Sequence, residues 1–305
     1  MKLYILRRLA QMVLTLLVIT IVVFVLSRMT GDPLALMMPQ DARPEDFAAI
    51  RQKLGLDKPV VVQYFMYLGG VARGDFGKSY KFGEPAAGLV LQRVPNTAQL
   101  TFSAILVGVL LGLPVGILSA VKRDSLFDRF GKAIALVGQA APTFWVGIML
   151  ILFFSVRWRL LPTSGQGDWH HIILPAITLG IYPVAGIARL TRSAMLDVLD
   201  REFIKVVRIK GAPELNVILK HALRNAAIPV VTFLGVTVGA LLSGTVVTET
   251  VFAWPGIGKL TVDAILFRDF PMVQAAVFVS ALFFLLINFA VDIVYLYVDP
   301  RISYR

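Results

Sequence analysis

The sequence predicts an all-α membrane protein with six transmembrane helices. Of its 305 residues, 57% are hydrophobic and only 16% are charged, whereas soluble domains carry about a quarter charged residues. The mean hydropathy is correspondingly high, at +0.76. A membrane-spanning helix needs about 20 mostly apolar residues, and six segments meet this requirement. They are Leu9–Ser27, Ala98–Val121, Ala133–Val156, Ile172–Leu190, Ala226–Thr248 and Met272–Val298.

The first three segments contain no charged residue within these limits. A charge at the centre of a bilayer costs about 2.5–3.5 kcal/mol on insertion scales, so its absence supports the assignment. A secretory signal peptide is the alternative for the first segment, with Lys2, Arg7 and Arg8 as its basic region. The apolar core is too long for that role, and residues 27–29 do not form a small-residue cleavage site. We therefore expect a retained helix.

The net charge of +11 raises the alternative of nucleic-acid binding. In a membrane protein, lysine and arginine instead gather on the cytoplasmic side. If the N-terminus is cytoplasmic, that side holds more than half of the 30 basic residues, eight of them between Arg189 and Arg224. Both termini are then cytoplasmic. The chain divides into residues 1–28 (N-terminus and first helix), 29–96 (external segment) and 97–305 (a five-helix core with a cytoplasmic loop at 191–225).

The external segment contains one clear helix signal. Pro44-Glu45-Asp46 places acidic residues in a first turn, Phe47, Ile50 and Leu54 follow at helical spacing, and Gly55 ends the pattern. We expect the remainder, which is rich in Gly and Pro, to form packed loop.

Catalytic, metal and nucleotide chemistry find little support in the sequence. The absence of cysteine excludes disulfides and thiolate metal sites. His170 and His171 adjoin one another without a carboxylate cluster, which favours a solvated interfacial pair over a metal site. Gly77-Lys78-Ser79 resembles the end of a phosphate-binding loop, but Ala72 stands where its first glycine is required. We expect no catalytic residue, no metal site and no cofactor on this chain.

Polar groups within the predicted helices are few. Gln139 lies in the third, and Asn288 and Asp292 lie in the sixth, whereas a proton-coupled transporter needs carboxylates or histidines deep in the bundle. The fifth helix has a small, hydroxyl-bearing face suited to a polar pathway. The candidate pathway residues are Gln139, Thr237, Ser243 and Thr245.

Glycines recur every four residues in two of the predicted helices. They are Gly108, Gly112 and Gly116 in the second, and Gly235 and Gly239 in the fifth. Small residues at this spacing allow close approach of helix backbones. We interpret those of the second helix as intrachain packing.

The basic stretch from Arg189 to Arg224 contains a predicted hairpin. Gly211 followed by Ala212-Pro213 ends one helix and begins another, and Leu215, Ile218, Leu219 and Ala222 then share a helical face. We expect a helix–turn–helix on the membrane surface, with apolar residues at its tip suited to a partner's groove. The alternative is an amphipathic segment that binds anionic lipid.

This stretch resembles the cytoplasmic "EAA" loop of permease subunits in bacterial binding-protein-dependent ABC importers. In that loop a glycine follows a Glu-Ala-Ala triplet at a fixed interval. With the glycine placed on Gly211, Lys205 replaces the glutamate, and Val206 and Val207 replace the alanines. Arg224 stands where the family has a later proline. These departures leave the individual contacts of the loop open.

The rest of the chain is similar to permeases of the dipeptide, oligopeptide, nickel and glutathione group. The matching motifs cover nearly its whole length. They are Gly31-Asp32-Pro33, Leu54–Pro59, Gly74-Asp75-Phe76-Gly77-x-Ser79, Arg93-x-Pro95-x-Thr97, Leu174-Pro175, Thr178-Leu179-Gly180, Lys220–Asn225, Ile228-Pro229, Glu249-x-Val251-Phe252-x-Trp254-Pro255-Gly256-x-Gly258, Arg268-Asp269-x-Pro271 and Asp299-Pro300.

The resemblance implies a type I ABC importer permease fold in the bacterial inner membrane. It implies a second homologous permease subunit, two ATP-binding subunits that hold ATP and Mg, and a periplasmic substrate-binding protein, with no nucleic acid. The substrate class is peptides, with glutathione, nickel chelates and opine-like conjugates as alternatives. The implied ATPase-docking residues are Phe203, Ile204, Lys205, Val206, Val207, Lys210, Gly211, Ala212 and Pro213. Candidate contacts for the binding protein are Glu249, Trp254 and Lys259.

Overall fold

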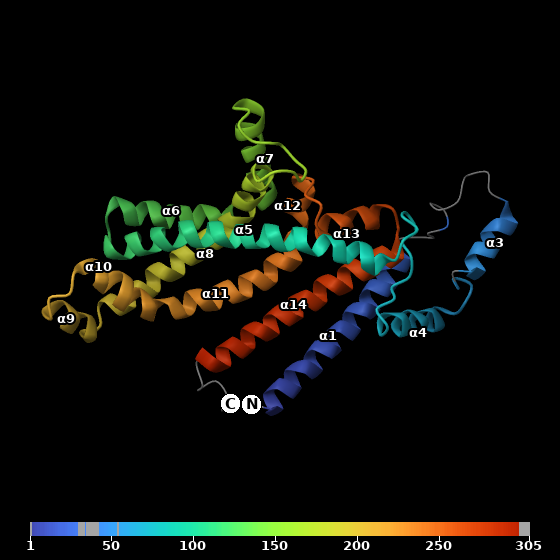
Figure 1. The fold of residues 1–305 in the computed structure, drawn as a ribbon, viewed down its shortest axis with the longest axis horizontal. Coiled ribbons are helices and arrows are strands. Elements are labelled where there is room, and N and C mark those ends of the chain that lie inside the picture. Colours follow the sequence, from blue (N-terminus) through green and yellow to red (C-terminus); the bar gives the residue numbers. More distant parts are fainter. Residues whose placement is uncertain (1, 30–33, 35–42, 54, 299–305) are drawn as a thin grey trace. The chain divides into compact units, whose positions relative to one another are not determined.

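The computed structural model describes residues 2–29, 34, 43–53 and 55–298, and these are helical apart from loops and one isolated bridge between Lys78 and Pro85 (Figure 1). This confirms the predicted all-α class. The helices are α1 (Lys2–Met29), α3 (Pro44–Lys53), α4 (Val60–Val71), α5 (Ala86–Val121), α6 (Leu126–Ala140), α7 (Thr143–Leu150), α8 (His170–Leu199), α9 (Glu202–Ile209), α10 (Glu214–Asn216), α11 (Leu223–Gly244), α12 (Val246–Val251), α13 (Ile257–Leu266) and α14 (Phe270–Val298), with π-helices η1 (Ile151–Arg157) and η2 (Val217–Ala222).

Five helical stretches of the described chain are long and apolar enough to cross a membrane, and a sixth candidate is a bent pair. The predicted span Ala133–Val156 is therefore not one straight helix. The stretch consists of α6 followed by α7 and η1, bent by 107° at a short break. Pro142 causes the break, since it follows Ala141, whose extended backbone (ψ 126°) is the conformation that a following proline favours.

The chain forms two compact units. The first comprises residues 1–97 and 255–289, and the second comprises residues 98–254 with the end of α14. This division cuts across α5 and α14. The motifs at Gly31–Pro33 and Asp299-Pro300 lie outside the described residues.

The first unit has an apolar core where the start of α5 packs with α13 and α14. Its buried members are Phe76, Ala86, Val90, Ile257, Ala264, Met272, Ala275, Ala276 and Val279. Asp269, only 2% exposed, precedes α14 and accepts a hydrogen bond from the Met272 backbone N–H at 3.3 Å. The Ser79 hydroxyl and the Lys81 backbone N–H also donate to its carboxylate, at 2.5 and 3.3 Å. Asp269 thus caps α14 and fixes the 79–81 turn against it.

The external segment contains one predicted helix and one that sequence reasoning missed. The helix predicted from Pro44 is present as α3, and Gly55 after it has a φ of 65°. The stretch expected as loop instead includes α4, a helix of twelve apolar-rich residues without a buried member. Val61, Phe65 and Met66 on it are 66%, 64% and 52% exposed. A run of apolar residues with glycines only at its end sustains a helix despite the Gly-rich surroundings.

The second unit is organised around α8, against which α6, α7 and α11 pack. The glycines of α5 allow close approach to α8. A Cβ on Gly112 would lie 2.9 Å from both the Ile187 Cβ and the Val184 carbonyl oxygen, and one on Gly116 would lie 2.7 Å from the Ala188 carbonyl oxygen. The predicted intrachain packing of the second helix is confirmed.

Candidate functional site

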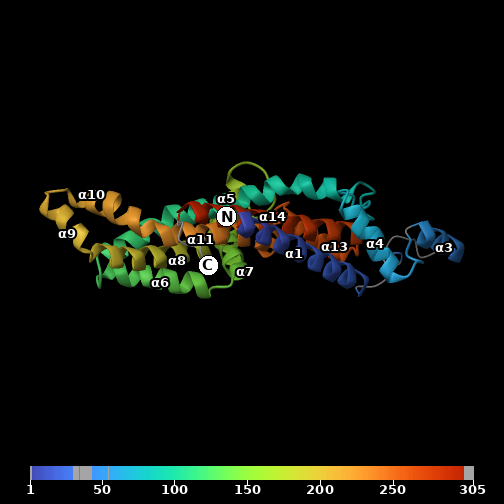
Figure 2. The same ribbon diagram turned by 90° about the horizontal axis from the view of Figure 1, so that it is seen from below.

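The predicted hairpin is formed by α9 and α10, and we refer to residues 202–216 as the α9–α10 hairpin. In the second unit it lies at the end of α8 and α11 (Figures 1 and 2). Gly211 has a φ of 78°, a left-handed conformation that only glycine adopts readily. Its N–H donates to the Arg208 carbonyl at 2.9 Å, and the Ala212 N–H donates to the Val207 carbonyl at 3.4 Å. This pair of bonds is a Schellman motif that ends α9, and Pro213 begins the next helix.

The inner face of the hairpin is buried against the ends of three longer helices. Ile204 is 0% exposed and belongs to an apolar cluster with members from α5, α8, η2 and α11: Ala120, Met195, Val198, Val217, Ala222 and Ala226. Val207 and Ala212 pack on the same cluster. Burial of one such side chain stabilises a fold by about 1.5–3 kcal/mol, so the base of the hairpin is firmly attached.

The outer face of the hairpin combines exposed apolar and basic side chains. Phe203, Val206 and Ile209 are 38%, 48% and 85% exposed, and Lys205 and Lys210 are exposed beside them. We call these five residues the crest. Single exposed apolar residues are ordinary, but several on one short helix at the tip of a hairpin form a surface suited to a protein partner.

An ion pair closes the turn of the hairpin. Arg208 donates to both carboxylate oxygens of Glu214, at 2.7 and 3.1 Å. The carboxylate raises the pKa of the Arg208 guanidinium. Both side chains are largely exposed, and such surface pairs stabilise by at most about 1 kcal/mol. Its contribution is therefore to the orientation of the two helices more than to stability.

The prediction that Leu215, Ile218, Leu219 and Ala222 share one helical face after the turn is wrong. Leu215 and Leu219 are 66% and 47% exposed, whereas Val217 and Ala222 are fully buried. The reason is the π-helix η2 at Val217–Ala222. A π-helix bonds residue i to residue i+5, and the five-residue interval between Val217 and Ala222 places both on the inner side.

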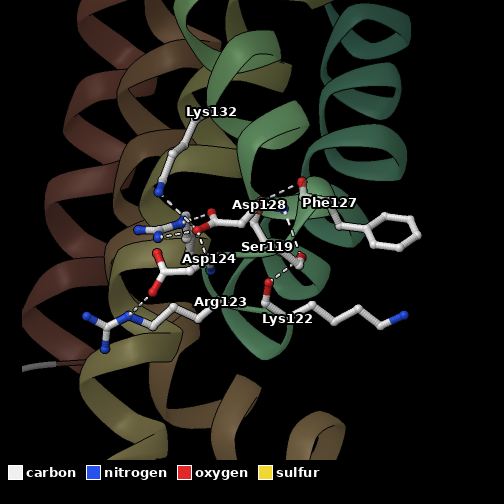
Figure 3. A network of polar contacts seen from close by, with 9 residues as sticks. Ser119, Lys122, Arg123, Asp124, Phe127, Asp128 and Lys132 are labelled. Carbon is white, nitrogen blue, oxygen red and sulfur yellow. Dashed lines mark hydrogen bonds and ion pairs between the residues drawn. The ribbon is translucent and has the colours of Figure 1, made fainter.

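Near the hairpin, a buried carboxylate joins α6 to α8 (Figure 3). Asp128 is 0% exposed and accepts from Arg192 Nε at 2.6 Å and Nη2 at 2.9 Å. Lys132 Nζ lies 3.0 Å from the same carboxylate, and the Asp124 backbone N–H donates to it at 3.0 Å. We call the Asp128–Arg192 pair the clamp. Asp128 lies eight residues after Ala120, which packs in the cluster beneath the hairpin.

Sequence reasoning missed the clamp because both of its residues lie in a region interpreted only as a basic cytoplasmic face. One signal was available. Asp128 follows Ser125, whose hydroxyl accepts from the Asp128 N–H at 3.4 Å and caps α6. The Ser125-x-x-Asp128 pattern is typical of a helix start, but it cannot reveal that the carboxylate will be buried.

The predicted pathway residues do not come together in one site. Gln139 is exposed and accepts from Arg189 Nη1 at 3.0 Å. Thr237 and Thr245 are buried, and the Thr245 hydroxyl donates to Glu249 at 2.8 Å. The side chain of Ser243 lies outside the described part of the structure. A role in a translocation pathway stays a prediction for these residues.

Two of the three predicted contacts for a binding protein are interior residues. Glu249 and Trp254 are 0% and 2% exposed, and the Trp254 N–H donates to the Glu249 carbonyl at 2.8 Å. Lys259 is partly exposed and pairs with Asp263 at 2.6 Å. In this conformation Glu249 and Trp254 support the loop from inside. Of the three residues, only Lys259 is exposed to a binding protein.

The histidine pair interacts with a neighbouring carboxylate. Asp168 lies 2.9 Å from Nδ1 of both His170 and His171, and these hydrogen bonds lower the pKa of Asp168 to about 2. No group of three or more metal-ligating side chains occurs within the described residues. The expectation of a solvated interfacial pair is consistent with the exposure of His170 and His171, at 41% and 27%.

Comparison with known proteins places the chain in a transport family. The family described as "Binding-protein-dependent transport system inner membrane component" matches residues 112–304, and its N-terminal counterpart matches residues 1–101. The glutathione transport system permease protein GsiC of Salmonella paratyphi A (strain ATCC 9150 / SARB42) is 42% identical over 303 residues, 99% of each chain. GsiC of Escherichia coli (strain K12) is 40% identical over the same length and coverage.

A solved structure shares the fold. The inward-facing MetNI methionine ABC transporter superposes with a TM-score of 0.55 at 23% identity, covering 69% of this chain and 96% of the other. Together with the family match over nearly all residues, the helical architecture identifies the molecule. The chain belongs to the inner membrane component family of binding-protein-dependent transport systems and is a permease subunit of an ABC importer.

Proposed function

We propose that this permease forms one half of the translocation pathway of an ATP-driven importer, and that its α9–α10 hairpin is the ATPase-docking element. The observation that carries the proposal is the crest. It exposes three apolar side chains, Phe203, Val206 and Ile209, on a hairpin whose inner face is buried in the ends of α5, α8 and α11. The exposed apolar side chains can bind a partner protein. The buried inner face can transmit a force from that partner to the attached helices.

Transport then proceeds by alternating access. Closure of the ATPases around ATP pulls the hairpin, and the helices to which it is attached change their position as rigid elements. The clamp joins α6 to α8 about ten residues, or roughly 15 Å along α8, before α9 begins. The hairpin, α8 and α6 therefore move together, and no residue of this chain needs to act in covalent chemistry.

The proposed assembly contains a second homologous permease, two ATP-binding subunits that hold ATP and Mg, and a periplasmic binding protein. Both termini are cytoplasmic, in support of which more than half of the basic residues lie on that side of the predicted topology. Lys259, on the opposite side, is proposed to contact the binding protein.

The proposed substrate is glutathione or a short peptide of similar size. The relatives at 40–42% identity are named as glutathione permeases, and their similarity extends over nearly the full chain. Uptake of labelled glutathione, dipeptides and nickel chelates by the reconstituted importer distinguishes these classes. Uptake that prefers a nickel chelate over every peptide would refute the proposal.

The docking role is tested by labelling a single cysteine. The natural chain has no cysteine, so Ile209→Cys provides a unique thiol at an 85% exposed position. Maleimide should label it in the isolated permease and fail to do so in the complex with the ATPases. Ser164→Cys, on an exposed loop of the same unit, serves as the control and should be labelled in both. Equal labelling of Ile209→Cys in an intact complex would rule out docking at the crest.

A further inference from the structure

A polar cavity of about 280 Å³ lies in the first unit, between the end of α1, α4, the 75–80 turn and the start of α14. Its walls carry a guanidinium, a carboxylate, two phenols and two amides, from Arg28, Asp75, Tyr67, Tyr80, Gln63 and Gln274. Such a concentration of polar groups beside apolar helices is unusual for packing alone. Neither the transport function nor the docking proposal for the hairpin gives this cavity a role.

Arg28 is held in one orientation but is not neutralised. Its Nε and Nη2 donate to Gln63 Oε1 at 3.1 and 2.6 Å, and its guanidinium lies 3.5 Å from the centre of the Phe24 ring. No carboxylate of the described residues forms an ion pair with it. Two buried side-chain atoms on the same wall, Arg28 Nη1 and Tyr67 Oη, have no hydrogen-bond partner in the described chain. Buried polar atoms are nearly always paired, so these two call for an anion or another polar group from outside the chain.

An apolar groove of about 260 Å³ follows the same helices away from this cavity. Val13, Leu17 and Thr20 of α1 line it, and Arg28 lies farther along the same helix. At 1.5 Å per residue, Thr20 and Arg28 are separated by about 12 Å. Phe278 of α14 lines the groove, one turn beyond Gln274 of the cavity. A cationic cavity and an apolar groove therefore lie along the same three helices, α1, α4 and α14, at a separation that one phospholipid can bridge.

The neighbouring helix α4 places the cavity at the depth of lipid headgroups. It contains no buried residue, and it exposes Val61 and Phe65 next to the end of the predicted span α1. A short apolar helix at the end of a span is typical of an interfacial helix whose apolar face enters the bilayer. Tyrosine is enriched at this level, and arginine side chains extend to it from within the membrane.

We propose that the cavity and the groove together hold one phospholipid, with its phosphate on Arg28 and one acyl chain in the groove. The guanidinium and the Tyr67 hydroxyl are the donors for the phosphate oxygens, and the Asp75 carboxylate favours a headgroup that ends in a primary ammonium. The preferred lipid is therefore phosphatidylethanolamine over phosphatidylglycerol. The small-solute alternative, a peptide carboxylate on Arg28, leaves the apolar groove without a function.

Native mass spectrometry of the detergent-purified importer complex tests the proposal, after incubation with equimolar phosphatidylethanolamine and phosphatidylglycerol. The natural complex should retain one phosphatidylethanolamine. Arg28→Gln should lower its retention about tenfold, because a hydrogen bond to a charged group is lost. Ala72→Phe, which fills the groove and leaves Arg28 intact, should also lower it. Arg73→Gln removes an exposed charge nearby and should retain the lipid.

Three results would overturn the proposal. They are unchanged retention in both Arg28→Gln and Ala72→Phe, equal retention of the two lipids, and displacement of the lipid by millimolar dipeptide. Should Arg28→Gln not assemble, Ala72→Phe decides alone. The labelling of Ile209→Cys is independent of this measurement, so failure of the lipid site and failure of the docking proposal are distinguishable.

Discussion

Disruption of the clamp tests how α6 and α8 are joined near the hairpin. Asp128→Asn keeps the shape of the side chain and removes its charge, while Arg192→Gln removes the other partner. In the natural chain the buried carboxylate accepts two hydrogen bonds from Arg192, at 2.6 and 2.9 Å. Asp128→Asn therefore leaves Arg192 beside a neutral amide, with only the exposed carboxylate of Asp124 to interact with its charge.

The expected loss is about 3 kcal/mol in the free energy of unfolding. Removal of one member of a buried ion pair costs about 3–5 kcal/mol, because the other charge remains uncompensated. The lower end applies here, since the Arg192 side chain is 22% exposed and can recover some hydration. Lys132, at 51% exposure, adds at most a few tenths of a kcal/mol, as exposed pairs do.

A double-mutant cycle separates the pair from its surroundings. Asp128→Asn, Arg192→Gln and the double variant are unfolded by SDS in mixed micelles, and we expect a coupling energy above about 1.5 kcal/mol. The matched control is the pair of Arg208 and Glu214, which has similar two-bond geometry but is largely exposed. Its coupling should stay below about 1 kcal/mol. Additive effects of the two clamp substitutions, within about 0.5 kcal/mol, would refute the argument that burial makes this pair strong.

Three further experiments follow from the geometry. Gly211→Pro should abolish uptake with the protein still in the membrane, because proline cannot adopt a φ of 78°, whereas Gly211→Asn should retain uptake; equal transport by both would contradict the turn's role. Gly112→Val should lower the amount of folded permease, since its Cβ would lie 2.9 Å from neighbouring atoms, while Gly88→Val on the same helix meets nothing within 4 Å and should accumulate normally; equal amounts on a membrane blot would speak against close α5–α8 packing. Trp254→Ala should lower the denaturation midpoint, because loss of a buried aromatic side chain costs about 3–5 kcal/mol. Lys259→Ala should instead lower only the uptake that depends on the binding protein. If the response to that protein is unchanged, Lys259 is not a contact.

Features of the fold set by local chemistry were predictable from the sequence. Long apolar segments identified the spanning helices because a bilayer imposes their length. The turn of the hairpin was predictable from Gly211-Ala212-Pro213, since a left-handed residue followed by a proline ends one helix and begins another. In both cases the deciding physics acts over a few consecutive residues.

Features set by tertiary packing were not predictable in this way. The buried position of Asp128 depends on Arg192, 64 residues away, and nothing near Asp128 in sequence announces that partner. The inner face after the turn depends on η2, because a π-helix changes which residues face inward. Only the bend at Ala141-Pro142 had a sequence signal that helical periodicity obscured, since the residue before a proline is biased away from helix.

In the proposed mechanism, the hairpin attached to α8 moves a large part of the permease. Two kinds of contact hold the neighbouring helices to α8, and they fail in different ways. The glycine contacts of α5 and α6 act by close packing, with Gly112 and Gly138 each leaving less than 3 Å for a Cβ. Such packing resists compression strongly, but it resists separation only through dispersion contacts that weaken steeply with distance. The clamp resists separation, because pulling Arg192 from the buried carboxylate exposes both charges to an incomplete set of partners. A force that pulls on the hairpin is a separating force, so the clamp, more than the glycine packing, keeps α6 with α8 when that force is applied.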